Sequence, residues 1–215
     1  MLKVILKRTL RFYFITDDNA FDLRPLEQVK IAIKAGATII QYRNKSFGLK
    51  SFGEIVAIRE LCSKNFIPFM VNDNILLAKS VMADGVHLGQ EDEDPEIARQ
   101  ILGSKAIIGV SVHDLKELKN SDLSCCDYIG TGPVFSTATK ADAKKVRGLS
   151  NLEAVAGKSP LPVVAIGGIN HTNAKSCLDH GAAGVAVISS ITRAKDPVQS
   201  ARQLAAACGC RFFSV

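Results

Sequence analysis

The sequence predicts a (β/α)8 barrel, an α/β fold in which eight parallel strands alternate with helices around a closed ring. Three observations favour it. Short apolar runs recur eight times along the 215 residues, at intervals of about 25 residues. Most stretches between them have the apolar spacing of an amphipathic helix. Polar or glycine residues follow most runs, where barrels of this kind place their chemistry.

The predicted strands are continuous apolar runs rich in Val, Ile and Phe, which is typical of parallel strands covered on both faces. Residues 1–11 form a basic lead-in, and 202–215 form a C-terminal tail. In chain order the strands are 12–15, 38–40, 67–71, 85–88, 106–110, 128–130, 163–166 and 185–188.

The boundaries of the predicted helices carry the residues expected there. Asp94 is placed to cap a helix whose first residue is Pro95, and Gly36, Gly103 and Gly181 follow predicted helix ends. One connection differs from the others, because 133–148 is long and lacks apolar periodicity. Such a segment indicates a binding loop or a lid.

The totals indicate a single domain over residues 1–215. Its 47% apolar and 22% charged residues are typical of a globular protein, and no apolar run reaches the roughly 20 residues of a membrane span. We expect a cytoplasmic location. The net charge of +6 suggests an anionic partner, but no Lys/Arg block indicates nucleic acid, so small phosphorylated substrates fit better.

Six cysteines without a Cys-x-x-Cys pair are expected to be free thiols, with neither a disulfide framework nor a zinc site. Cys125 and Cys126 precede a strand and should be packed. Cys208 and Cys210 fall in the predicted tail, where surface exposure is expected.

Three polar residues alternate at the end of the second strand. Gln41, Arg43 and Lys45 would share a direction, since side chains alternate along a strand. Two cations and an amide at one barrel mouth can grip a pyrophosphate. The alternative is a solvated strand end whose charges pair with neighbouring carboxylates.

Carboxylates follow the third and fourth strands. Asp73 and Asp92 would hold Mg²⁺, which takes one or two carboxylates together with waters and phosphate oxygens. Surface carboxylates are the alternative, and Asp94 is already explained as a cap. His87, within a strand, is more simply a packing residue than a catalyst.

Gly167-Gly168 and Ser189-Ser190 follow the seventh and eighth strands, where such barrels often bind a phosphate. In the long loop, Lys140 follows two hydroxyl residues and could close over substrate. The residues alone therefore indicate an enzyme that joins or rearranges two phosphorylated small molecules, one carrying a Mg-bound pyrophosphate.

Seven phrases resemble the thiamine-phosphate synthase family, in order along residues 12–201. They are Gln41-Tyr42-Arg43-Asn44-Lys45, Val71-Asn72-Asp73, Gly85 to Asp92, Gly109 to His113, Gly132 to Lys140, Ala165 to Ile169 and Val187-Ile188-Ser189. The resemblance implies a transferase that couples 4-amino-2-methyl-5-hydroxymethylpyrimidine diphosphate with 4-methyl-5-(2-hydroxyethyl)thiazole phosphate, or its carboxylated form, giving thiamine phosphate and pyrophosphate.

The resemblance also implies roles for individual residues, with Arg43, Lys45 and Lys140 stabilising the leaving pyrophosphate and Mg²⁺ assisting its loss. The pyrimidine diphosphate would contact Gln41, Arg43, Lys45, Asn72, Ser111 and Lys140. The thiazole phosphate would contact Thr137, Thr139, Gly168, Ile188 and Ser189. The metal would contact Asp73 and Asp92.

Two alternatives remain. A thiazole tautomerase-type isomerase of the same fold would carry a histidine where this chain has Pro133. A non-catalytic paralogue that binds thiamine phosphates would be favoured by loss of a metal carboxylate or of Lys140, and all three residues are present.

Overall fold

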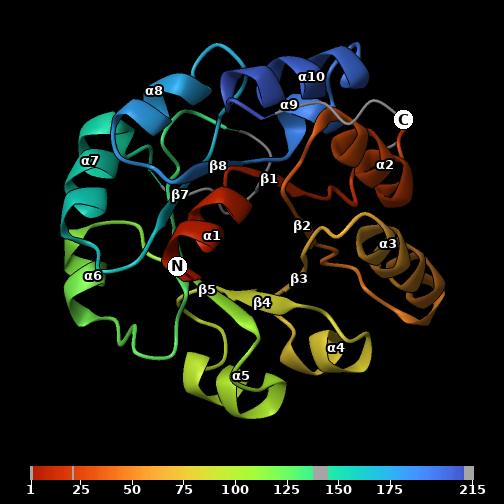
Figure 1. The fold of residues 1–215 in the computed structure, drawn as a ribbon, viewed down its shortest axis with the longest axis horizontal. Helices are drawn as coiled ribbons and strands as arrows, with labels where there is room; N and C mark the ends of the chain where they lie inside the picture. The colour runs from red at the N-terminus through yellow and green to blue at the C-terminus, as the bar shows by residue number, and fades with distance from the viewer. Residues whose placement is uncertain (1, 21, 138–144, 211–215) are drawn as a thin grey trace.

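The barrel predicted from the sequence is confirmed. The computed structural model describes residues 2–20, 22–137 and 145–210. Eight parallel strands pair in chain order and β8 closes on β1, with helices forming the outer ring (Figure 1). No helix in these ranges is long and apolar enough to cross a membrane.

Every predicted strand is present, three with the predicted bounds and the others displaced by one or two residues at an end. They are β1 Phe12–Ile15, β2 Ile39–Tyr42, β3 Phe69–Asn72, β4 Gly85–Leu88, β5 Ile107–Ser111, β6 Tyr128–Thr131, β7 Val163–Ile166 and β8 Gly184–Val187. Most extensions lie at the carboxyl ends, because polar residues such as Gln41, Asn72 and Ser111 continue the ladder.

The helices follow the expected alternation. They are α1 Leu2–Thr9, α2 Pro25–Ala35, α3 Phe52–Lys64 (after the 3-10 turn η1 Leu49–Ser51), α4 Ile75–Ser80, α5 Pro95–Leu102, α6 Leu115–Asn120, α7 Gly148–Lys158, α8 Ala174–Asp179, α9 Ser189–Thr192 and α10 Pro197–Ala207. The Asp94 carboxylate accepts from the backbone N–H of Glu96 at 2.7 Å, which confirms the predicted cap. Gly36 ends α2 with φ of 103°, a conformation that favours glycine.

The structure adds a helix at one end of the chain and buries a cysteine at the other. Residues 2–9 are the helix α1, which lies across one end of the barrel in Figure 1, and Leu6 and Leu10 pack against the apolar interior there. The predicted tail boundary at 202 falls inside α10. Cys208 is 1% exposed, so the expectation of surface exposure was wrong. Burial raises the pKa of its thiol to about 12.

Two apolar layers hold the barrel. The larger lies between strands and helices, and the smaller fills the barrel interior. The interior includes two buried aromatic side chains, Tyr13 and Tyr128. Gly109 makes room for the second, since a Cβ there would lie 2.1 Å from the Tyr128 ring. The cluster closes the barrel below its carboxyl-end cavity.

Candidate active site

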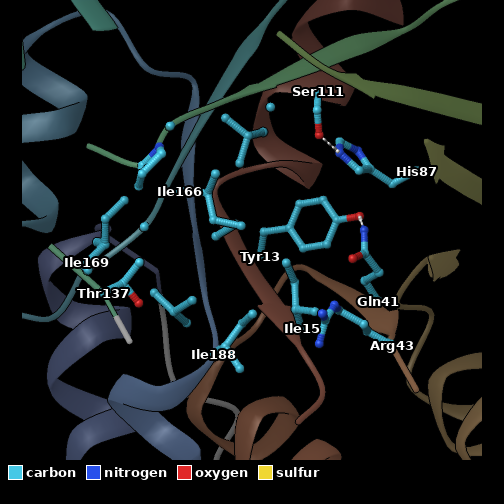
Figure 2. Close-up of a pocket in the computed structure, with 18 of the residues that line it drawn as sticks. Tyr13, Ile15, Gln41, Arg43, His87, Ser111, Thr137, Ile166, Ile169 and Ile188 are labelled. Atoms are coloured by element: carbon cyan, nitrogen blue, oxygen red, sulfur yellow. Dashed lines mark hydrogen bonds between the residues drawn. The ribbon is translucent and has the colours of Figure 1, made fainter. Parts of the chain in front are cut away.

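The carboxyl ends of the strands surround a cavity of about 970 Å³. Figure 2 shows side chains converging on it from several strands. Thr139 and Lys140 lie outside the described residues. All other site residues predicted from the sequence line the cavity, namely Gln41, Arg43, Lys45, Asn72, Asp73, Asp92, Ser111, Thr137, Gly168, Ile188 and Ser189.

The end of β2 carries a buried cation. Arg43 is 6% exposed and Gln41 is 2% exposed, and both line the cavity. Tyr42, between them, instead packs in the strand–helix layer, so the predicted alternation is confirmed. The fully buried Thr16 hydroxyl accepts from the Arg43 backbone N–H at 2.9 Å and donates to its carbonyl at 3.1 Å.

Within the described residues, Arg43 has no carboxylate partner for its guanidinium. A buried charge is costly unless it is paired. An anionic ligand in the cavity would therefore supply the missing counter-charge. The absence of a carboxylate partner among the described residues argues against the alternative that Arg43 belongs to a solvated strand end paired with neighbouring carboxylates.

Two carboxylates occupy the ends of neighbouring strands. Asp73 follows β3 with φ of 63°, and its backbone N–H donates to the His87 carbonyl at 2.8 Å. This left-handed conformation is uncommon for residues other than glycine, and aspartate is among those that adopt it most readily. Asp92 accepts from the Gly89 backbone N–H at 2.5 Å, which holds the loop after β4.

The donor set fits a hard cation that keeps ligands from elsewhere. Asp73, Glu91 and Asp92 line the cavity, but no group of three or more His, Cys, Asp or Glu side chains in the described ranges converges on one point. A few carboxylates beside an anion site suit Mg²⁺, which also takes water and phosphate oxygens.

A chain of hydrogen bonds crosses the cavity floor, and the sequence did not reveal it. Gln41 Nε2 donates to the Tyr13 hydroxyl at 2.9 Å, and the Tyr13 and Tyr128 hydroxyls are 2.9 Å apart. His87 links this pair to β5, with Nδ1 3.0 Å from the Tyr128 hydroxyl and Nε2 3.1 Å from the Ser111 hydroxyl. Burial raises the pKa of both tyrosines.

The β7 and β8 side of the cavity is built from backbone and apolar side chains. Gly167 and Gly168 have φ of 99° and 63°. A Cβ at Gly168 would lie 2.4 Å from the Ser136 carbonyl oxygen, so only glycine fits. Figure 2 shows Ile166, Ile169 and Ile188 beside Thr137 on this side.

Asp17 joins this side to β1 and was not expected to do so. The carboxylate is 2% exposed and accepts from the Thr192 hydroxyl at 3.3 Å and from Arg193 Nε at 3.0 Å. These bonds fix the short helix α9, which begins at Ser189.

Comparison with known proteins shows which family the chain is similar to. A family model described as thiamine monophosphate synthase matches residues 12–191. Thiamine-phosphate synthase of Bacillus velezensis is 39% identical, covering 93% of this chain and 91% of the relative. The enzyme of the same name from Persephonella marina is 45% identical over 85% and 88% of the two chains.

A solved structure is similar over nearly its whole length. Thiamine phosphate pyrophosphorylase from Pyrococcus furiosus superposes with a TM-score of 0.85 at 36% identity, covering 95% of this chain and 98% of that one. Thus sequence and three-dimensional comparison lead to the same group of enzymes.

Proposed function

The chain belongs to the thiamine monophosphate synthase family and is a transferase of thiamine phosphate synthesis, and from that premise we propose how its cavity holds two substrates. The observation that carries the proposal is the buried Arg43, which has no carboxylate partner among the described residues and lines one cavity with Asp73 and Gly168.

The first substrate is 4-amino-2-methyl-5-hydroxymethylpyrimidine diphosphate. Its diphosphate takes the place of the missing counter-charge at Arg43 and also contacts Lys45, while Gln41, Asn72 and Ser111 complete the site. An arginine gives a planar fork for phosphate oxygens, and a lysine gives a mobile point charge. Lys140, outside the described residues, is proposed as a further contact to the diphosphate.

Asp73 and Asp92 hold the metal ion that the family uses in catalysis, and we propose that it is Mg²⁺. When bound, this ion neutralises charge on the diphosphate.

The second substrate is 4-methyl-5-(2-hydroxyethyl)thiazole phosphate or its carboxylated form. Its phosphate contacts Gly168, Ile188 and Ser189, with Thr137 and Thr139 from the long loop. Bare amides of glycine approach a phosphate closely. The isoleucines of β7 and β8 offer an apolar surface to the ring.

The chemistry requires charge stabilisation more than acid or base. The bond between the pyrimidine methylene carbon and the diphosphate oxygen breaks, and the pyrophosphate leaves with the electron pair. The thiazole nitrogen then forms a bond to that carbon with its lone pair. Arg43 and Lys45 stabilise the charge that develops on the leaving oxygen, as preorganised groups in a sheltered site do.

A coupling assay tests the proposal. Purified protein with both substrates and Mg²⁺ should form thiamine phosphate and pyrophosphate in equal amounts. No thiamine phosphate from the folded enzyme would overturn it. The carboxylated thiazole phosphate supplied alone separates the tautomerase alternative, which would isomerise it; Pro133 lines the cavity where that enzyme needs a histidine.

A further inference from the structure

The hydrogen-bond chain below the cavity has a direction that the bonded groups determine. It runs through Gln41, Tyr13, Tyr128, His87 and Ser111. We infer that Gln41, at one end, fixes His87 as the neutral tautomer with its hydrogen on Nε2, and thereby turns the Ser111 hydroxyl hydrogen toward the diphosphate of the bound substrate. This inference gives His87 a positioning role and rests on the proposed function of Ser111.

The direction of donation along the hydrogen-bond chain is set by the side-chain amide of Gln41. Gln41 Nε2 can only donate, so the Tyr13 oxygen accepts at 2.9 Å. The Tyr13 hydrogen then needs an acceptor, and the Tyr128 oxygen at 2.9 Å is the one that the described residues provide. The reverse donation would leave the Tyr13 hydrogen unpaired in a fully buried position, which is costly.

The same reasoning carries the direction to the histidine. Because Tyr128 accepts from Tyr13, it donates its own hydrogen to His87 Nδ1 at 3.0 Å. Burial raises the pKa of both tyrosines, so each keeps its single hydrogen. A bare Nδ1 requires the hydrogen of the neutral ring on Nε2, and this hydrogen is donated to the Ser111 oxygen at 3.1 Å.

The direction of these hydrogen bonds determines whether Ser111 offers the substrate a hydrogen or a lone pair. Within the described ranges, His87 is the one group bonded to the Ser111 hydroxyl, and Ser111 lines the cavity. Since the hydroxyl accepts from His87, its hydrogen is left to donate to an anion. In the opposite direction Ser111 would spend its hydrogen on His87 and present lone pairs to the diphosphate. A donor suits a leaving diphosphate, as oxyanion-hole donors do.

The tautomer can be read directly in the free protein by nitrogen-15 NMR of the imidazole ring. The chain has four histidines, and the signals absent from a His87→Gln variant identify His87. We expect the Nε2–H tautomer. An Nδ1–H tautomer at His87 in the wild-type protein would overturn the inference, even if the Tyr13 and Gln41 variants failed to fold.

Two variants test whether Gln41 sets the direction. Tyr13→Phe removes the bridging hydroxyl, and Gln41→Met removes the terminal donor at similar size. Either should convert His87 into a mixture of both tautomers. Tyr42→Phe is the matched control, because this buried tyrosine bonds Asn44 and has no part in the chain. An unchanged His87 signal in Tyr13→Phe would contradict the assigned direction.

Binding of inorganic pyrophosphate with Mg²⁺ tests the consequence at Ser111. If half of the free protein holds the wrong tautomer, apparent affinity falls about twofold in Tyr13→Phe and stays unchanged in Tyr42→Phe. A mixed tautomer without loss of affinity would refute the role of Ser111. Failure of the wild-type coupling assay would instead overturn the proposed function, and the tautomer measurement is independent of it.

Discussion

In the function that we propose, the two sides of the cavity bind phosphate by different means. The charged side consists of Gln41, Arg43, Lys45, Asp73 and Asp92, and it acts through side chains at the ends of β2 to β4. The glycine side consists of Gly167, Gly168, Ile188 and Ser189, after β7 and β8, and acts mainly through backbone. Under this proposal, the charged side chains lie at the diphosphate whose bond breaks, whereas the other phosphate is only held in place.

The two sides are also supported differently. Arg43 is held through its backbone by the buried Thr16, so its side chain can be removed while this support remains. Gly168 depends on a backbone conformation and on close contact with Ser136, so one added methyl group alters the site itself. Substitutions should therefore separate electrostatic effects on one side from steric effects on the other.

The largest expected effect is on the charged side. Asp73→Asn or Asp92→Asn should lower kcat by about a hundredfold or more, since a bound metal contributes several kcal/mol of transition-state stabilisation. Excess Mg²⁺ should restore part of the loss in steady-state assays. Asp94→Asn is the control, because asparagine caps a helix as well as aspartate does. Full activity of either first variant without metal would end the metal assignment.

On the glycine side, a substitution should impair binding through a steric clash. Gly168→Ala places a Cβ 2.4 Å from the Ser136 oxygen at φ of 63°, so the loop must move. We expect KM for the thiazole phosphate to rise more than about tenfold, with the pyrimidine diphosphate less affected. Gly157→Ala, in α7 with open space around its Cβ, should leave both constants unchanged. Equal changes for both substrates would contradict separate sides.

Strand positions and the cavity residues could be predicted from the sequence, because apolar runs and the polar residues after them repeat with the barrel. The hydrogen-bond chain on the cavity floor could not be predicted from the sequence. Tyr13 and Tyr128 read as ordinary members of apolar strands, and only the closed barrel places their hydroxyls together. Likewise, the contact between Asp17 and Arg193 joins residues 176 positions apart, which no local pattern indicates.

The helix α1 and the burial of Cys208 were not predicted, for a related reason. The helix α1 has only eight residues, and it gains its partner only when the barrel end is formed. Cys208 stands just beyond α10, where a sequence pattern suggests a tail, but α10 packs it against the core. Tertiary packing decided both cases.

Arg43→Ala and Ser189→Ala test whether each side serves one substrate. Each removes hydrogen bonds to a charged group and should cost roughly 1 to 3 kcal/mol in kcat/KM. The loss should appear with the pyrimidine diphosphate for Arg43→Ala and in KM for the thiazole phosphate for Ser189→Ala. Steady-state kinetics with one substrate saturating separates the two. Equal effects of both variants on both substrates would refute the division.

The smallest expected effect is a gain in stability on the glycine side. Ser190 lines the cavity beside Ser189, and its buried hydroxyl oxygen has no hydrogen-bond partner among the described residues. A buried unpaired hydroxyl costs about 1 to 3 kcal/mol, and alanine favours a helix more than serine does. Ser190→Ala should therefore raise the free energy of unfolding by about 1 kcal/mol, and Tm by about 2 to 4 °C.

Ser200→Ala is the matched control for this last prediction. The Ser200 hydroxyl donates to the Ser190 carbonyl at 2.5 Å, so its removal loses a bond at the same place and should lower Tm. Both variants remove one hydroxyl. A higher Tm in Ser190→Ala and a lower Tm in Ser200→Ala would show that the destabilisation comes from the unpaired Ser190 hydroxyl. A lower Tm in Ser190→Ala would show that this hydroxyl stabilises the free protein. The charged side and the glycine side would then differ in charge, and no longer in whether a buried hydroxyl is left unpaired at a cost.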